Sequence, residues 1–399
     1  QEELTAGNIY EYGFHALVDS SDKECVKYGL SLLELFDTDS HEELKEIIRT
    51  IGLSDEFSIF AIFVMLRWED GNNEVWQLAK KIHGWGRIHA VERLEPASVE
   101  IKRWLLLEGV HNRIMPAYSA LTCWRKSDAE TILRNDPTRE EFSGIRDMIG
   151  ELLDEGPVPG ISEIDNSDDV IIMFLNKAKQ MASEVEDYVI VRDIRMYFET
   201  EDPEHTEIVS LCREILSTDR CREAVLEAVK GGRAIGLAQD LKLDYKEDSL
   251  ALMKSSFQSN YHLCTFLMEE PGNKEEVMGL FRQQLPLSEM KTRPEKSLGV
   301  GVKYWRQQAL EILLQELRRY PLEGQDFVET ALQSAPIRTR QFGIGVLESW
   351  VSAKQIPLSE LLPEMQELLC RLREIEPDEE VKGNMTRLID GNITFEVLS

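Results

Sequence analysis

The residues best suited to binding chemistry lie between His83 and Leu94, where the chain reads His-Gly-Trp-Gly-Arg-Ile-His-Ala-Val-Glu-Arg-Leu. Imidazole, indole and guanidinium groups together suit a peptide, an anionic group or an aromatic ligand. The surrounding segment, residues 76–134, carries ten Lys and Arg against six Asp and Glu, whereas the whole chain has a formal net charge of −28. A ligand site is therefore expected here before anywhere else.

The predicted ligand-binding residues come from this stretch and from the next fifty residues: Trp85, Arg87, His89, Arg93, Trp104, Asn112, Arg113 and Tyr118. We predict that Arg87 and Arg113 hold an anionic group. Trp85 and Tyr118 would supply apolar contact, and His89 would tune the site near neutral pH. A structural interpretation stays open, because tryptophans also pack between helices and arginines at helix starts also pair with acidic residues.

Other chemistry has little support in the sequence. His83 and His89 are six residues apart, which is not the spacing of two metal ligands on one helix face, so we expect no metal. Gly231-Gly232 belongs to neither a dinucleotide-binding fingerprint nor a phosphate loop, and the Gly-x-Ser-x-Gly motif of hydrolases is absent. We assign no catalytic residue and expect no cofactor.

The elements that must position these residues are predicted to be helices. Apolar residues recur at helical spacing along nearly every segment, and Ser54, Ser98 and Thr138 are expected N-caps. Residues 188–191 are the best candidate strand, but the apolar residues that follow them return to helical spacing, so we predict a helix there as well. Helices of about ten to eighteen residues joined by short turns favour antiparallel pairs. The predicted fold class is all-α.

Three stretches share a further pattern, in which an arginine is followed by small and aliphatic residues. They are Gly86 to Leu94, Tyr304 to Leu314 and Ile337 to Val351. These stretches resemble the second helices of HEAT-type, armadillo-like repeats. The resemblance implies an α-solenoid of stacked helical hairpins and the usual role of such proteins, which is to hold a protein or peptide partner. A helical bundle of fewer, longer helices is the competing fold.

Two segments rich in Gly and Pro interrupt the helical pattern, at residues 156–167 and 285–301. The first separates the aromatic, locally basic part of the chain from a more acidic remainder. We therefore predict an N-terminal helical array at 1–155, a linker at 156–167 and an acidic C-terminal array at 168–399.

Composition limits the environment and the partners. No segment approaches the ~20 apolar residues that cross a bilayer, so no membrane partner is expected. The six cysteines are scattered, with no Cys-x-x-Cys pair, which indicates a reducing compartment and a cytoplasmic protein. The resemblance to helical-repeat proteins implies a bacterial source. A net charge of −28 repels polyphosphate and argues against nucleic-acid binding.

Two alternatives to a non-enzymatic binding module stay open. HEAT-like alkylpurine DNA glycosylases use Trp, Arg and an acidic residue on a concave face. The tryptophans between residues 76 and 124, together with the local excess of positive charge, resemble that combination. His83 to Pro96 also resembles a stretch of bacterial helical proteins, some of which are described as limonene hydroxylases, and this implies a small-molecule enzyme. A hydroxylase needs haem, flavin or non-haem iron, and the sequence has no Rossmann fingerprint and no facial triad. The binding module is the favoured prediction.

Overall fold

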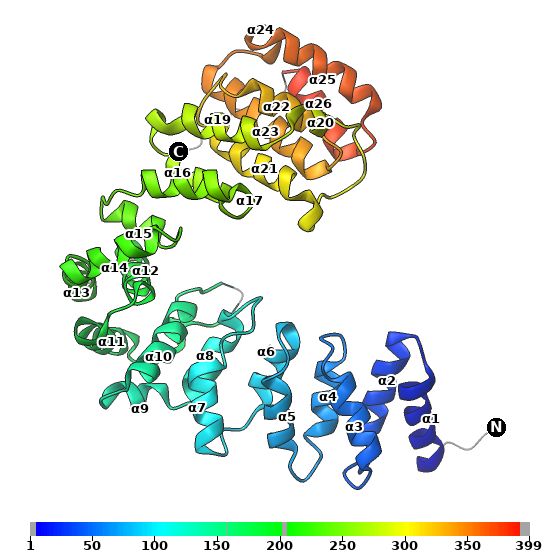
Figure 1. Cartoon of the computed structure of the whole chain (residues 1–399). Helices are drawn as coiled ribbons and strands as arrows, with labels where there is room; N and C mark the ends of the chain where they lie inside the picture. The colour runs from blue at the N-terminus through cyan, green and yellow to red at the C-terminus, as the bar shows by residue number, and fades with distance from the viewer. Residues whose placement is uncertain (1–4, 157, 202–205, 392–399) are drawn as a thin grey trace. The chain divides into compact units, whose positions relative to one another are not determined.

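The computed structural model describes residues 5–156, 158–201 and 206–391, and every regular element in these ranges is a helix (Figure 1). The same ranges contain no strand, although a single parallel bridge joins Ser297 to Pro336. Residues 188–191, the best candidate strand, lie inside a helix, Val185–Glu201. The prediction of an all-α fold is confirmed.

The chain divides into two units, residues 1–222 and 223–399, and the division falls inside α14 (Asp219–Val229). The first unit contains α1 (Ala6–Asp19), α2 (Lys23–Leu33), α3 (Glu42–Ile51), α4 (Ser58–Met65), α5 (Gly71–Ala79), α6 (Gly84–Arg93), α7 (Val99–Glu108), α8 (Ala117–Lys126), α9 (Ala129–Arg134), α10 (Arg139–Leu152), the 3-10 turn η1 (Ile161–Glu163), α11 (Ser167–Met181), α12 (Val185–Glu201) and α13 (Thr206–Leu216). The predicted linker at 156–167 lies within this unit, where Ile161 and Ile164 are buried.

Local capping explains several helix starts in the first unit. Thr138 forms a capping box with Glu141 at the start of α10, and the Ser98 side chain accepts a hydrogen bond from Ile101 N in α7. Ser54 is not an N-cap as predicted, because residues 54–57 form a turn and α4 begins only at Ser58. Ser98 and Thr138 thus cap their helices as expected.

The helices of the first unit pack in two sets. α2, α4, α6, α8, α10 and α12 each contact the next member of their set, and α1, α3, α5, α7 and α9 pack against the helix that follows them (Figure 1). Glycines let α1 and α2 approach closely, since a Cβ atom at Gly29 would lie 2.8 Å from the Gly13 carbonyl oxygen. α4, α6, α8 and α10 thereby each pack against three or more neighbouring helices.

The second unit contains α15 (Ile235–Asp240), α16 (Lys246–Ser255), α17 (Phe257–Asn260), η3 (Tyr261–Leu263), α18 (Cys264–Leu267), η4 (Pro271–Asn273), α19 (Lys274–Gln284), α20 (Leu287–Met290), η5 (Val302–Tyr304), α21 (Trp305–Leu317), α22 (Gln325–Leu332), α23 (Ile337–Lys354), α24 (Leu358–Leu361), α25 (Pro363–Ile375) and α26 (Glu379–Ile389). The central helix is α23, which contacts α21, α22, α24 and α26. Its Trp350 side chain is fully buried and donates a hydrogen bond to the Leu317 carbonyl at 2.7 Å.

Candidate functional site

The start of α6 and the loop at residues 109–116 bring most of the predicted site residues together. The Gly84 amide donates to the Asn112 carbonyl at 2.8 Å, which fixes the loop against the helix. The Gly86 amide donates to the Asp55 carboxylate at 2.6 Å, so an acidic residue from another turn caps α6. The helix N-terminus is thus occupied by the chain itself.

The five tryptophans of this region have different environments. Trp68 and Trp124 are buried, each 4% exposed, while Trp76 and Trp104 are half-buried. Trp85 is 44% exposed, and its ring meets the edge of Tyr118 at a centroid distance of 5.2 Å. Trp85 is therefore the indole of this group that is best placed to contact a partner.

Arg87 is buried although it was expected to face a ligand. It is 4% exposed, its guanidinium lies 5.1 Å from the Trp104 ring centre, and its terminal nitrogen donates to the Glu108 carbonyl at the end of α7. Burial lowers the pKa of Arg87, as does Arg113, while Glu108 opposes the change. Its Nε atom has no hydrogen-bond partner in the described structure. These contacts tie α6 to α7.

Arg113 has the opposite environment. It is exposed, with a φ of 72° in the left-handed region, and it forms no hydrogen bond or ion pair with any described residue. Asn112, which is fully buried, holds this conformation: its Oδ1 atom accepts from the amides of Ile114 and Met115 at 3.1 and 2.8 Å. Asn112 is thus a loop-forming residue, and Arg113 is the exposed one.

His89 and Arg93 lie further along α6. The His89 Nδ1 atom is 3.8 Å from the Glu92 carboxylate, and the His89 ring centre is 6.4 Å from that of Trp85. Arg93 donates to the same carboxylate at 2.7 Å and packs over the Phe63 ring at 4.8 Å. The Arg93 guanidinium therefore interacts with side chains of the protein itself. His89 is half-buried beside Trp85.

Some residues of this site were missed by the sequence prediction. Ile114 and Met115 are 44% and 39% exposed, directly after Arg113. His83, at the start of α6, has a pKa lowered first by burial and then by Arg113 and Arg87. Two apolar residues in a short loop that ends in proline are the only sequence signal for Ile114 and Met115, and their exposure is visible only in the structure.

The Trp85 surface, as we call it below, consists of four exposed residues, Trp85, Arg113, Ile114 and Met115, and of Tyr118, which is half-buried against Trp85. Aromatic residues, Met and Arg are enriched where proteins bind one another. The nearby Cys123 thiol is fully buried and burial raises its pKa to about 12, so it is unsuited to nucleophilic attack. The described residues hold no group of three or more His, Cys, Asp or Glu able to bind a metal ion.

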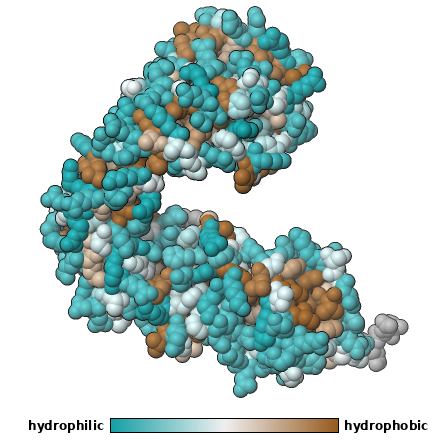
Figure 2. Space-filling view, viewed as in Figure 1, coloured by the Kyte–Doolittle hydropathy of each residue, from teal (hydrophilic) through white to brown (hydrophobic). Residues whose placement is uncertain are grey.

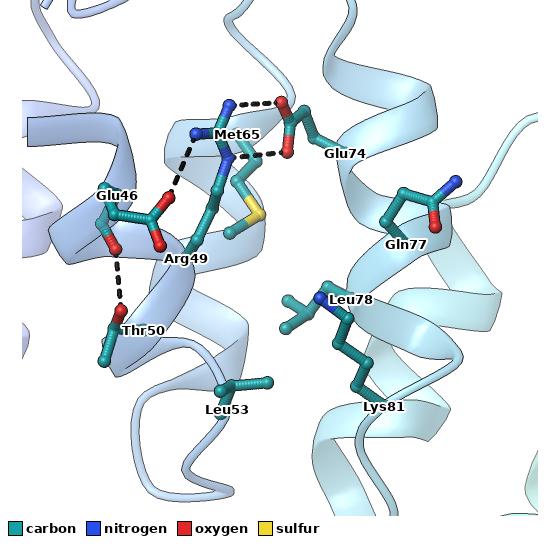
Figure 3. A pocket seen from close by; sticks show the side chains of 9 residues that line it. All are labelled: Glu46, Arg49, Thr50, Leu53, Met65, Glu74, Gln77, Leu78 and Lys81. Carbon is teal, nitrogen blue, oxygen red and sulfur yellow. Dashed lines mark hydrogen bonds and ion pairs between the residues drawn. The ribbon is translucent and has the colours of Figure 1, made fainter. Parts of the chain in front are cut away.

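A separate pocket lies between α3, α4 and α5 (Figure 3). Its volume is about 170 Å³, below the ~300 Å³ at which ligand pockets usually begin. Arg49 points at Glu74 and bonds both of its carboxylate oxygens, at 3.0 and 2.6 Å, and it also bonds Glu46 at 3.3 Å. The hydrogen bonds that Arg49 donates to Glu74 raise the pKa of Arg49. This arginine is neutralised, so the pocket offers no strong anion site.

Two larger hollows occur, one in each unit. The first, about 360 Å³, lies beside Tyr188, Glu214 and Arg220, and the second, about 390 Å³, lies beside Lys242 and Tyr245. The hydroxyls of both tyrosines donate to main-chain carbonyls, and burial raises the pKa of both, that of Tyr188 to about 12. Neither tyrosine is suited to act as a base near neutral pH.

Comparison with known proteins gives no family assignment: neither a scan against protein-family models nor a search of the curated proteins found a match to this chain. Among the described helices, none combines the length and the apolar character needed to cross a membrane. The six cysteines, all within the described ranges, are free thiols, and four of them are buried.

Proposed function

We propose that this chain is a non-enzymatic α-solenoid of HEAT-like helical hairpins that binds a protein or peptide in the cytoplasm. The packing of the first unit supports the architecture, because one set of helices from α2 to α12 forms a continuous series of neighbours and the other set lies against it. The three HEAT-like stretches fall on α6, on η5 with α21, and on α23, so each lies on a helix.

Buried ion pairs between successive hairpins also support repeats. Arg139 and Arg146 of α10 both bond Asp187 of α12, at 3.1 and 2.9 Å. Burial raises the pKa of Asp187, but hydrogen bonds from two backbone amides and the two arginines lower it overall. In the second unit Arg340 of α23 bonds Glu376, which follows α25, at 2.8 and 2.6 Å. The arginine-to-acid pairing expected between repeats therefore has examples in both units.

The observation that carries the binding role is the conformation of Arg113. A left-handed backbone is unfavourable for any residue with a side chain, and glycine would relieve it. Arg113 nevertheless extends an unpaired guanidinium from this position, directly before two exposed apolar residues. Its loop lies against the start of α6, because the Asn112 carbonyl accepts from the amide of Gly84, the residue before Trp85. A planar guanidinium on the same surface as an exposed aromatic ring suits a peptide that carries a carboxylate next to an apolar side chain.

Selection from a random-sequence peptide display library would test this role. We expect the wild-type chain to enrich peptides that combine an acidic residue or a terminal carboxylate with a large apolar residue. Arg113→Gly removes the side chain and relieves the strain, so it should abolish enrichment while stability is kept or raised by up to about 1 kcal/mol, because strain relief exceeds or offsets the larger unfolded-state entropy of glycine. Trp85→Ala should weaken binding by about tenfold or more, the loss typical of a central aromatic contact.

A matched control comes from Gln355, which also has a left-handed backbone, with a φ of 57°, at the end of α23. Gln355→Gly should give a similar gain in stability and leave peptide enrichment unchanged. Selected peptides that bind Arg113→Gly and Trp85→Ala as well as the wild type would overturn the proposal. A salt-sensitive shift of duplex DNA by the wild type alone would favour the glycosylase-like alternative.

A further inference from the structure

A second cationic segment lies in the other unit, at residues 291–306 between α20 and α21. It reads Lys-Thr-Arg-Pro-Glu-Lys-Ser-Leu-Gly-Val-Gly-Val-Lys-Tyr-Trp-Arg, with five Lys and Arg against one Glu. Residues 223–399 as a whole carry 21 Lys and Arg against 28 Asp and Glu, so this excess is local. The segment is called the Leu298 loop below.

Three aliphatic side chains stand exposed at the middle of the Leu298 loop. Leu298 is 66% exposed, Val300 69% and Val302 82%. Such exposure of three aliphatic residues in five positions is unusual on a soluble surface and marks a contact with a partner or a lipid. Figure 2 shows hydrophobic atoms on the surface at the place that this segment, yellow in Figure 1, occupies.

The base of the loop is held firmly. The Ile337 amide donates to the Ser297 carbonyl at 2.8 Å, and the Glu295 amide donates to the Ala335 carbonyl at 3.0 Å. The fully buried Arg340 donates to the Glu295 carbonyl at 3.1 Å. These bonds anchor one side of the loop to α23, so the aliphatic residues are displayed rather than collapsed onto the unit.

The other side of the loop is held by short-range contacts. The hydroxyls of Ser297 and Tyr304 lie 2.8 Å apart, and the Tyr304 amide donates to the Gly301 carbonyl at 3.0 Å. Gly299 and Gly301 have φ angles of 73° and 103°, which L residues rarely adopt, and they allow the chain to turn between the aliphatic residues. The backbone conformation of the loop therefore keeps its aliphatic tip exposed.

The cations that flank the tip are available to a partner. Arg293, Lys296, Lys303 and Arg306 are exposed, and none of them forms an ion pair with a described carboxylate. Lys303 and Arg306 instead lie over the rings of Tyr304 and Trp305, at 4.8 and 5.2 Å. The fifth cation, Lys291, pairs with Glu329 at 2.8 Å.

We propose that the Leu298 loop docks the chain on an anionic lipid surface. Leu298, Val300 and Val302 enter the boundary between headgroups and acyl chains, and the cations on either side contact the headgroups. Tyr304 and Trp305 are residue types that favour this interface. The sequence led us to expect no membrane partner because no segment can cross a bilayer, and docking on the surface requires no such segment.

A lipid surface fits this loop better than a protein or DNA. A stable protein interface buries about 800 Å² on each side, more than three aliphatic side chains on one short loop provide. Lipid binding instead increases with whatever apolar area is inserted, together with the nearby positive charge. Phosphates of DNA would meet the cations but offer nothing to the aliphatic tip. The aliphatic residues lie at the tip of the loop and the cations lie on both sides of them. Insertion of the tip would therefore leave the cations level with the anionic headgroups.

Sedimentation with vesicles tests the proposal on the full chain. The probes are vesicles of phosphatidylcholine alone and vesicles in which about one third of the lipid is phosphatidylserine. We expect association with the anionic vesicles, and loss of it as salt rises, because the cations are exposed and screened. Arg293→Gln with Lys296→Gln should lower the partition coefficient on the order of tenfold. Leu298→Ser with Val300→Ser should lower it by a similar factor.

Matched controls come from the same unit. Lys354→Gln with Arg371→Gln removes two exposed cations elsewhere, and Leu226→Ser with Ile375→Ser removes two exposed aliphatic residues, 41% and 56% exposed. Both should bind vesicles as the wild type does, with thermal unfolding unchanged in every variant. Arg113→Gly should also bind normally, because this proposal does not depend on the Trp85 surface.

Three results would overturn lipid docking. The wild type could fail to bind the anionic vesicles at physiological salt. The loop variants could bind them as tightly as the controls do. Duplex DNA or an acidic polypeptide could bind in a loop-dependent way while the vesicles do not, which would assign the loop to a different class of partner.

Discussion

Two regions of the molecule carry the same local charge excess and use it differently. Residues 76–134 have ten Lys and Arg against six Asp and Glu, and the Leu298 loop has five against one, so both exceed neutrality by four. In the first region the cations are largely engaged: Arg87 is buried, and the Lys126 amine donates to the carbonyls of Glu92 and Leu94 at 2.7 and 2.8 Å. In the loop four of five cations are unpaired. A charge excess in a sequence becomes a binding surface only where folding leaves it unpaired.

The apolar residues beside these charges differ as well. The Trp85 surface offers aromatic rings, a methionine and one arginine, the composition of a protein-binding contact. The Leu298 loop offers three aliphatic side chains on a tight turn, flanked by lysines and arginines. The first suits a peptide with a defined shape, while the second suits a fluid apolar layer under anionic headgroups. The comparison therefore predicts two independent partners.

The largest expected effect concerns Arg340, which anchors the Leu298 loop and is fully buried with Glu376. Arg340→Met leaves an uncompensated buried carboxylate and removes the donor from the Glu295 and Ser334 carbonyls, so we expect a loss of about 3–5 kcal/mol. Hydrogen exchange of amides in α23 and α25 would measure it. Arg371→Gln, an exposed cation on α25, should change exchange by less than about 0.5 kcal/mol.

A double variant separates the two causes of that loss. Combining Arg340→Met with Glu376→Gln removes the unpaired charge and should recover part of the stability, while the loop stays loosened because the Glu295 and Ser334 carbonyls still lack a donor. If Arg340→Met left exchange in α23 and vesicle binding both unchanged, the loop would not depend on this anchor, and the contrast with the Trp85 surface would lose its structural basis.

The next effect distinguishes the two arginines that the sequence placed in one site. Arg87→Met should destabilise the first unit by about 1–3 kcal/mol, because the Glu108 carbonyl loses one of its two donors and the Trp104 ring loses its stacked cation. Arg113→Met should change stability by less than about 0.5 kcal/mol, because the side chain is exposed and unpaired. Hydrogen exchange of α6 and α7 measures both. Equal effects would mean that the two arginines share one role, contrary to the structure.

The sequence predicts the helices well and the exposure of individual residues poorly. Helical spacing and the Thr138 cap depend only on residues that are close in the sequence, so both are found in the structure. Even residues 188–191 are helical as expected. The burial of Arg87 depends instead on Trp104 and Glu108, which come from the next helix. A pattern of residue types around position 87 contains no information about how closely that helix packs.

The same limit explains the missed residues. Ile114 and Met115 are apolar and would be assigned to a core, but the Asn112 side chain folds the loop so that they face outward. The prolines and glycines of residues 285–301 correctly predict an interruption of the helices. The display of Leu298 depends on the bridge between Ser297 and Pro336, a long-range pairing that the loop sequence does not encode by itself.

The smallest expected effect tests whether Arg113 acts on its own neighbours. The pKa of His83 is lowered by burial first and then by Arg113 and Arg87. Because the folded pKa lies below the unfolded value of about 6.5, the unfolded chain binds more protons just below that pH, and stability falls as pH decreases through this window. Arg113→Gln removes one of the two positive charges, so the pKa should rise toward its ordinary value and the acid-induced loss of stability should shrink. An NMR titration of the His83 ring, assigned with His83→Gln, measures the shift.

The control is Lys80→Gln, which removes an exposed cation three residues before His83 in the sequence. Lys80 lies over the Trp76 ring, so this substitution should leave the titration unchanged. Equal titrations for Arg113→Gln and Lys80→Gln would show that the Arg113 charge does not reach the start of α6, and the Trp85 surface would then consist of aromatic contacts without an electrostatic component.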